Sequence, residues 1–214
     1  MKRRRSRWPG YKCIGDYHGR RYDCDFVSPY AKTAGNFDSQ IMVLLQDWSS
    51  NDALCGNFHD DCAKCGYGVN LPSNKNLIRL LEEHYHLSLK DVWGSNVFPF
   101  IKMGGLSSRI PPQDLCRGAV EFALPEIQIV RPKLVICFGQ ATFNAVRKAC
   151  ELDPVYPLAK AIRSPFTWPV GRREVRIWCQ AHPGRLGQNM RNRGGRLRVP
   201  GDWKRMREEV PIRG

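Results

Sequence analysis

The run Ile41-Met42-Val43-Leu44-Leu45 is followed at once by Gln46-Asp47, and the run Leu134-Val135-Ile136-Cys137-Phe138 is followed by Gly139-Gln140. Five consecutive apolar residues are typical of a strand that is buried on both faces of a parallel sheet. Two weaker runs, 91–97 and 174–180, also carry polar residues at or near their ends. Because the carboxyl ends of parallel strands lie along one edge of a sheet, we expect these polar residues to meet in one crevice.

Helical segments separate the four runs. We expect helices over about 74–86, capped by Ser73, and over about 112–130, 140–150 and 202–210. Alternating strands and helices predict a single α/β domain over 41–214, with a short four-stranded parallel sheet and helices on both faces, an α/β/α sandwich. Residues 1–40 are interpreted as a basic N-terminal arm and loop layer, and residues 46–73 as a long irregular loop.

The charge of the chain favours a polyanionic partner. Its 214 residues carry a net charge of +14, from 34 Lys and Arg against 20 Asp and Glu, and nucleic acid is the commonest such partner. A basic protein without a nucleic-acid role is the alternative. One basic stretch follows the last predicted strand directly. It contains Arg185, Arg191, Arg193, Arg196, Arg198, Lys204, Arg205 and Arg207.

The sequence predicts no membrane association. Its longest purely apolar strand-like runs have five residues, far below the roughly 20 that span a bilayer. The charged start Met1-Lys2-Arg3-Arg4-Arg5 precedes Trp8-Pro9-Gly10 rather than an apolar segment, so it is not a signal peptide. We expect an intracellular, DNA-associated monomer, in the cytoplasm of a prokaryote or in a nucleus.

The nine cysteines are odd in number and spread along the chain, which suits reduced thiols in an intracellular protein. Cys55, His59, Cys62 and Cys65 have the spacing of a zinc knuckle. A loop of free thiols is the competing interpretation, and it is the preferred one, so we expect no cofactor.

The ordered motifs resemble the uracil-DNA glycosylase superfamily. Leu45-Gln46-Asp47-Trp48-Ser49 is similar to the family's Gly-Gln-Asp-Pro-Tyr or Gly-Glu-x-Pro-Gly motif, and His182-Pro183-Gly184-Arg185-Leu186 to its His-Pro-Ser-Pro-Leu motif. The similarity extends to three further segments between them. They are Pro72-Ser73-Asn74-Lys75-Asn76-Leu77, Ser95-Asn96-Val97-Phe98 and Phe138-Gly139-Gln140-Ala141. Together the matches span about 41–190.

The resemblance implies a monofunctional DNA glycosylase. Such an enzyme flips uracil out of single- or double-stranded DNA and hydrolyses its N-glycosidic bond, leaving an abasic site. Asp47 is expected to position the water and stabilise the sugar cation, and His182 to donate to the carbonyl where negative charge develops. No lysine is obviously placed as a Schiff-base nucleophile, so strand cleavage is not expected.

The resemblance also implies roles in binding. Gln46 and Asn96 would contact the uracil edge, because an amide donates to a carbonyl and accepts from a ring N–H. Tyr67 would form the aromatic floor, with Phe58 and Phe98 as rivals. Leu186 would fill the gap in the base stack, and Arg185 and Arg191 would hold phosphates. Further DNA contacts are expected at Pro72, Ser73, Gly139 and Gln140.

Some features depart from the family or leave alternatives open. Ser49 replaces the tyrosine that excludes thymine in some branches, and Gly184-Arg185 replaces Ser-Pro, which predicts a more flexible and more basic loop. Some relatives carry an iron–sulfur cluster, but Cys13, Cys24, Cys116 and Cys137 do not match that pattern. Asp47 and Asn96 also suit ordinary turn and strand-end roles. The alternative functions are a non-catalytic DNA-binding module of the same fold and a zinc-containing nucleic-acid-binding protein.

Overall fold

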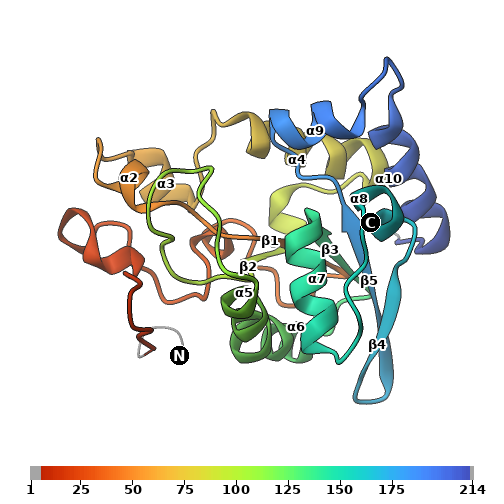
Figure 1. Ribbon diagram of the computed structural model, residues 1–214, viewed down its shortest axis with the longest axis horizontal. Helices are drawn as coiled ribbons and strands as arrows, with labels where there is room; N and C mark the ends of the chain where they lie inside the picture. The colour runs from red at the N-terminus through yellow and green to blue at the C-terminus, as the bar shows by residue number, and fades with distance from the viewer. Residues whose placement is uncertain (1–5, 213–214) are drawn as a thin grey trace.

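A computed structural model describes residues 6–212, and a central five-stranded sheet runs through it (Figure 1). The strand order is β2-β1-β3-β5-β4. The strands are β1 (Ile41–Leu45), β2 (Trp93–Asn96), β3 (Leu134–Phe138), β4 (Phe166–Val170) and β5 (Arg173–Gln180). The basic run Met1-Lys2-Arg3-Arg4-Arg5 lies outside the described residues. The α/β class predicted from the sequence is confirmed.

Four of the strands are parallel, as predicted. β1 pairs with β2 and β3, and β3 pairs with β5, all in parallel. The register sets Leu45 opposite Asn96 and Phe138 opposite Gln180, so the last residues of neighbouring strands lie side by side. The carboxyl ends of β1, β2, β3 and β5 therefore share one edge of the sheet.

The prediction of four strands was wrong by one, because β4 forms a hairpin with β5. β4 pairs antiparallel with β5 and lies at the end of the sheet. It contains Pro169, and proline, which lacks a backbone N–H, is tolerated in a sheet mainly at an edge. Three of its five residues are not buried, so the segment has no apolar run that would identify it as a strand.

All four predicted helical segments are present, but their bounds differ and further short helices accompany them. α4 begins at Pro72 with Leu71 as its N-cap, so Ser73 is not the capping residue. The predicted helix over 112–130 is continuous but contains a π-helical segment, η5, just before Pro125, whose ring excludes the ordinary bond to the carbonyl four residues back. The helices are α2 (Asn51–Leu54), α3 (Asp60–Cys65), α4 (Pro72–Tyr85), α5 (Pro112–Gly118), η5 (Ala119–Ala123), α6 (Leu124–Val130), α7 (Gln140–Ala149), α8 (Leu158–Ile162), α9 (Arg185–Arg191) and α10 (Arg198–Glu209).

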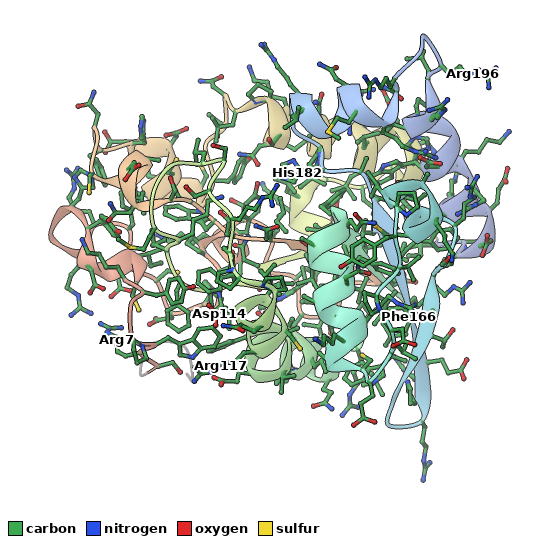
Figure 2. The ribbon with its side chains drawn as sticks, in the orientation of Figure 1. Arg7, Asp114, Arg117, Phe166, His182 and Arg196 are labelled. Carbon is green, nitrogen blue, oxygen red and sulfur yellow. The ribbon has the colours of Figure 1, made fainter. Side chains whose placement is uncertain are left out.

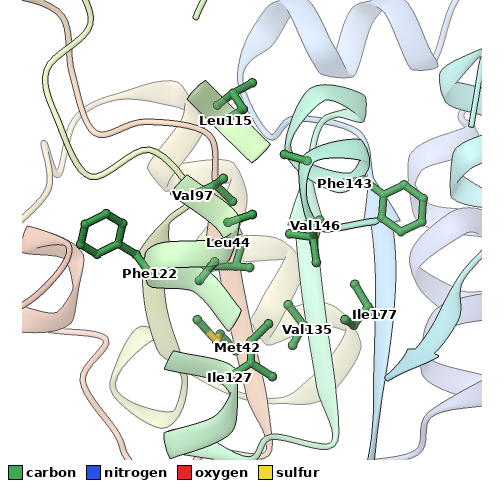
Figure 3. Packing of buried hydrophobic residues seen from close by; sticks show 14 of the residues in the cluster. Met42, Leu44, Val97, Leu115, Phe122, Ile127, Val135, Phe143, Val146 and Ile177 are labelled. Atoms are coloured by element: carbon green, nitrogen blue, oxygen red, sulfur yellow. The ribbon is translucent and has the colours of Figure 1, made fainter. Parts of the chain in front are cut away.

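Each face of the sheet packs against its own cluster of apolar side chains. Met42 and Leu44 of β1 face the cluster beneath α5, α6 and α7, which Figure 3 shows from close by. Ile41, Val43 and Leu45 face the opposite cluster, formed with α4 and α10. This alternation is the side-chain period of a strand, and it places helices on both faces of the sheet.

Residues 6–40 are a packed layer rather than a free arm. Trp8 and Ala31 belong to the first apolar cluster, Tyr30 to the second and Tyr22 to a third. Short 3-10 helices, at Ile14–Asp16, His18–Arg20 and Pro29–Lys32, shape this layer. Within residues 6–212, no helix is both long enough and apolar enough to cross a membrane.

Candidate active site at the carboxyl edge of the sheet

The residues that follow β1 and β5 lie at the same edge of the sheet, on either side of β3. The backbone N–H of Phe98 donates to the carbonyl of Gln46 at 2.8 Å, which extends the pairing of β1 and β2 past their ends. Because β3 lies between β1 and β5, the Asp47 and His182 loops begin two strand spacings apart, roughly 10 Å. Figure 2 shows His182 where β5 ends, beneath α9.

Asp47 is a buried carboxylate with a buried cation beside it. Its Oδ2 lies 3.0 Å from Nζ of Lys102, and the side chains are 11% and 7% exposed. Gln46 Nε2 donates to the other carboxylate oxygen at 3.3 Å. Burial raises the pKa of Asp47 above its ordinary value, and the neighbouring Lys102 and the Gln46 hydrogen bond oppose this increase. An ion pair this dry interacts much more strongly than one exposed to water.

His182 is arranged as a neutral hydrogen-bond donor. The backbone N–H of Gly184 donates to its Nδ1 at 3.0 Å, so the neutral ring carries its proton on Nε2. Burial lowers the pKa of His182 below its ordinary value, and the charge of Lys102 lowers it further. At neutral pH the imidazole is therefore uncharged and offers Nε2–H.

The loop that carries His182 receives hydrogen bonds from side chains of α4 and α9. Asn76 Nδ2 donates to the carbonyl of Pro183 at 2.8 Å, and Gln188 Nε2 donates to that of His182 at 3.2 Å. A Cβ at Gly184 would lie 2.8 Å from Ser73 Oγ and 2.9 Å from His182 Nδ1. Glycine is needed here because the start of α4 packs against the histidine loop, which also brings Pro72 and Ser73 to the site.

Asn96 is the last residue of β2, and within residues 6–212 its buried side-chain amide is hydrogen-bonded through the oxygen alone. Ser28 Oγ donates to its Oδ1 at 2.5 Å, while its Nδ2 has no hydrogen-bond partner among the described residues. The Oδ1 atom keeps a second lone pair. A buried donor without a partner costs about 1–3 kcal/mol, so a ligand carbonyl would be a favourable partner for this amide.

Tyr67 is held by the N-terminal layer. Its ring stacks on Tyr30 with centroids 5.7 Å apart and an angle of 17° between the planes. The preceding residue is fixed too, because Trp48 Nε1 donates to the carbonyl of Gly66 at 2.8 Å. Tyr67 is half-buried, whereas its rival Phe98 is fully buried in the core and Phe58 packs against Tyr22. Phe58 is half-buried as well, so burial excludes only Phe98 among the three aromatics.

Gly139 and Gln140 join β3 to α7 in the same region. Gly139 has φ of +89°, a conformation that glycine adopts without strain, and its N–H donates to the carbonyl of Gln180 at 2.8 Å. Gln140 Nε2 donates to the carbonyl of Val155 at 3.0 Å, so its amide supports the following loop. The turn therefore presents mainly its backbone to the carboxyl edge.

The basic stretch divides into paired and unpaired cations. Arg191 forms a two-pronged ion pair with Asp202, at 2.6 and 2.8 Å, so its guanidinium is occupied in joining α9 to α10. Within this stretch, the exposed cations that form no ion pair with a described residue are Arg185, Arg193, Arg196, Arg198 and Arg207. In Figure 2, Arg196 extends from the segment between α9 and α10. Leu186, 75% exposed, follows Arg185 directly.

The four residues of the possible zinc knuckle do not converge. Cys55 ends α2 and is exposed, whereas Cys62 and Cys65 lie on α3. Burial, together with the neighbouring Asp61, raises the pKa of Cys62 to about 11. Within the described part of the chain, no three His, Cys, Asp or Glu side chains are placed to hold a metal ion.

Three residues of this site were not predicted from the sequence. Lys102 had a detectable signal, since it is a charged residue directly after the apolar run Val97-Phe98-Pro99-Phe100-Ile101. Ser28 and Tyr30 had none, because they reach Asn96 and Tyr67 only through the fold.

Comparison with known proteins adds no relative to this description. No family model matches the chain, and no curated protein matches it.

Proposed function

We propose that this protein is a DNA glycosylase that flips uracil out of DNA and hydrolyses its N-glycosidic bond. One observation carries the proposal: the buried carboxylate of Asp47 and the neutral imidazole of His182 stand at strand ends two spacings apart on one sheet edge. The motifs shared with the uracil-DNA glycosylase superfamily support the same reaction. A base held between these groups would have an anion on its sugar side and a donor on its carbonyl side.

Each group matches a charge that develops in the reaction. Bond breaking leaves positive charge on the sugar and negative charge on the departing base. The Asp47 carboxylate would stabilise the sugar cation and orient the attacking water. The His182 Nε2–H would donate to the base carbonyl, and a donor fixed beforehand in a dry site acts without reorganisation.

Recognition of the base would involve Asn96 and Tyr67. The free Nδ2 of Asn96 would donate to a uracil carbonyl, and the remaining lone pair of Oδ1 would accept from the ring N–H. Cytosine presents an amino group and an unprotonated nitrogen at these positions, so both contacts favour uracil. Tyr67, backed by Tyr30, would stack on the base.

The surface around α9 would hold the DNA. Leu186 is an exposed apolar side chain beside the site, suited to fill the gap that a flipped nucleotide leaves. The unpaired arginines near it, Arg185, Arg193, Arg196 and Arg198, would neutralise phosphates. Arg191 is not included, because Asp202 occupies it.

Release of free uracil from a uracil-containing oligonucleotide tests the proposal directly. We expect release from single strands and from duplexes, with hypoxanthine and thymine mismatches assayed alongside to define the base range. The Asp47→Asn variant, which we expect to be much slower, is assayed beside the native protein. Tight binding without release of any base would instead favour the non-catalytic DNA-binding module.

A further inference from the structure

Lys102 is a buried cation that the proposed reaction leaves without a role. It lies in the loop after β2, with a side chain only 7% exposed. Its Nζ lies 3.0 Å from Asp47 and donates to the carbonyl of Leu106 at 2.6 Å. An ammonium group is costly to bury, and it is rarely buried without such partners. Two contacts fix the position of this charge beside the carboxylate.

The field of Lys102 acts on both of the proposed catalytic groups. It favours the charged form of Asp47, which burial alone would disfavour. The same positive charge disfavours a second cation on His182. The same positive charge thus keeps Asp47 ionised and His182 neutral. These are the two protonation states that the proposed reaction requires.

Among the described residues, Lys102 is the charged group that acts on both Asp47 and His182, and three other charged side chains, Arg109, Asp114 and Arg117, line one cavity with it. Beside Asp47 lies the neutral amide of Gln46. The histidine loop contacts α4 through Ser73 and Asn76 and α9 through Gln188, which are all uncharged. The nearest arginine in sequence, Arg185, is exposed to solvent, where its charge is screened.

We propose that Lys102 is a positioning residue whose fixed ammonium group keeps Asp47 as a carboxylate and His182 as a neutral imidazole. One cation would thus set the protonation states of two groups that lie on different strand ends. This inference rests on the proposed function for its purpose, but the charge coupling itself is measurable without DNA.

Titration of His182 by NMR, in the full-length protein, tests the coupling. The chain has five histidines, and a His182→Ala variant identifies the resonance. We expect the pKa of His182 to rise in Lys102→Gln and to stay near the native value in Lys102→Arg. His84 is an internal control, because its pKa is lowered by burial and by Arg207 and Arg79 rather than by Lys102. An unchanged His182 titration in Lys102→Gln would overturn the proposal.

A second variant covers the risk that Lys102→Gln leaves Asp47 buried without a partner and unfolds the protein. The double variant Asp47→Asn, Lys102→Met removes both charges together, which proteins tolerate better than loss of one. The pKa of His182 should rise there too, because Lys102 is the charged group that lowers it. A value equal to that of the native protein would count against the coupling.

The dependence of uracil release on pH separates a charge effect from loss of the Leu106 contact. In Lys102→Gln the acidic limb of the single-turnover rate should move to higher pH, so the fractional loss of rate should be larger at pH 5.5 than at pH 8. Lys102→Arg should restore the native limb. An equal loss at every pH, with His182 unchanged, would mean a structural role only.

The two proposals fail in different ways. Absence of uracil release, together with the expected movement of the His182 titration, would reject the glycosylase and support the charge coupling. Normal uracil release with no change in titration or pH profile would retain the glycosylase and reject the role of Lys102.

Discussion

The side chain of Asn76 donates a hydrogen bond of 2.8 Å to the carbonyl of Pro183, although 107 positions separate them in the sequence. This contact joins the first turns of α4 to the loop that carries His182. The fit of Gly184 against Ser73 strengthens the same junction. The helix α4 therefore holds the loop of His182 in place. The orientation of the imidazole depends on Asn76, a residue that takes no part in the proposed chemistry.

Replacing Asn76 should slow base release more than it weakens the fold. Asn76→Ala removes one hydrogen bond, worth about 1 kcal/mol of stability, but it frees the loop that aims His182. We expect a single-turnover rate at least tenfold lower, with a modest loss of melting temperature. Glu82→Ala, an exposed position on the same helix, is the matched control. Equal effects from the two variants would show that the junction does not orient the histidine.

Leu186→Ala should reduce excision from duplex DNA more than from single strands. Without the leucine, the gap left by the flipped nucleotide stays open and the base returns to the stack, whereas a single strand has no stack to restore. Rates on the two substrates under single-turnover conditions give the ratio. Leu197→Ala, 78% exposed between α9 and α10, should leave that ratio unchanged. A ratio unaffected by Leu186→Ala would remove the wedge from the proposal.

The salt dependence of DNA binding should identify the arginines that contact phosphates. Each phosphate contact contributes about 0.9 to the slope of log affinity against log salt. Replacing Arg193 and Arg196 with glutamine should lower that slope by roughly two units. Arg172 and Arg173 are exposed at the β4–β5 turn, at the end of the molecule away from His182 (Figures 1 and 2), so replacing them changes the net charge equally and should leave the slope nearly unaltered. Similar slopes for both double variants would place the DNA elsewhere.

The strongest sequence signals placed the sheet and the ends of its strands. The bounds of β1 and β3 were predicted correctly because an unbroken apolar run has one plausible location, between two layers of helices. Because the predicted strands are parallel, their carboxyl ends share one edge of the sheet. This led to the expectation that Asp47 and His182 belong to one site. β4 was missed because an edge strand needs little burial and tolerates Pro169.

The supporting residues could not be predicted in the same way. Ser28 contacts Asn96, and Tyr30 stacks on Tyr67, only because residues 6–40 fold back over the sheet, and no periodic pattern marks that layer. In the sequence, Arg191 cannot be told apart from the other arginines of the basic stretch. In the fold it differs from them, because α10 places Asp202 beside it. Long-range polar contacts depend on the packing of several elements, whereas local apolar patterns do not.

Base release should have an acidic limb but remain high at neutral pH. As the pH falls, His182 gains a proton near its pKa, which burial and Lys102 hold below 6.5, and Asp47 gains one near its pKa, which burial holds above 3.8. Both changes remove an active form, so the rate should rise with pH across this region. Single-turnover rates from pH 4 to pH 8 measure the limb. A rate that increases as the pH falls would contradict both assignments.

Asp47 and His182 should each contribute to the rate far more than to DNA binding. Asp47→Asn and His182→Ala each remove one preorganised electrostatic partner, which typically costs about a hundredfold or more in rate. Affinity for uracil-containing DNA should change little, because phosphate contacts and the wedge supply most of it. Single-turnover rates and binding isotherms on the same duplex separate the two quantities.

The double variant tests whether Asp47 and His182 act as a unit. If the anion stabilises the sugar while the imidazole stabilises the departing base, both act in one transition state, and their losses should not multiply. The double variant should therefore lose less rate than the product of the single losses. Melting temperatures control for the buried Lys102 that Asp47→Asn leaves without its anion. Near-native activity of Asp47→Asn would show that another group, such as Asn96 at the adjacent strand end, positions the water.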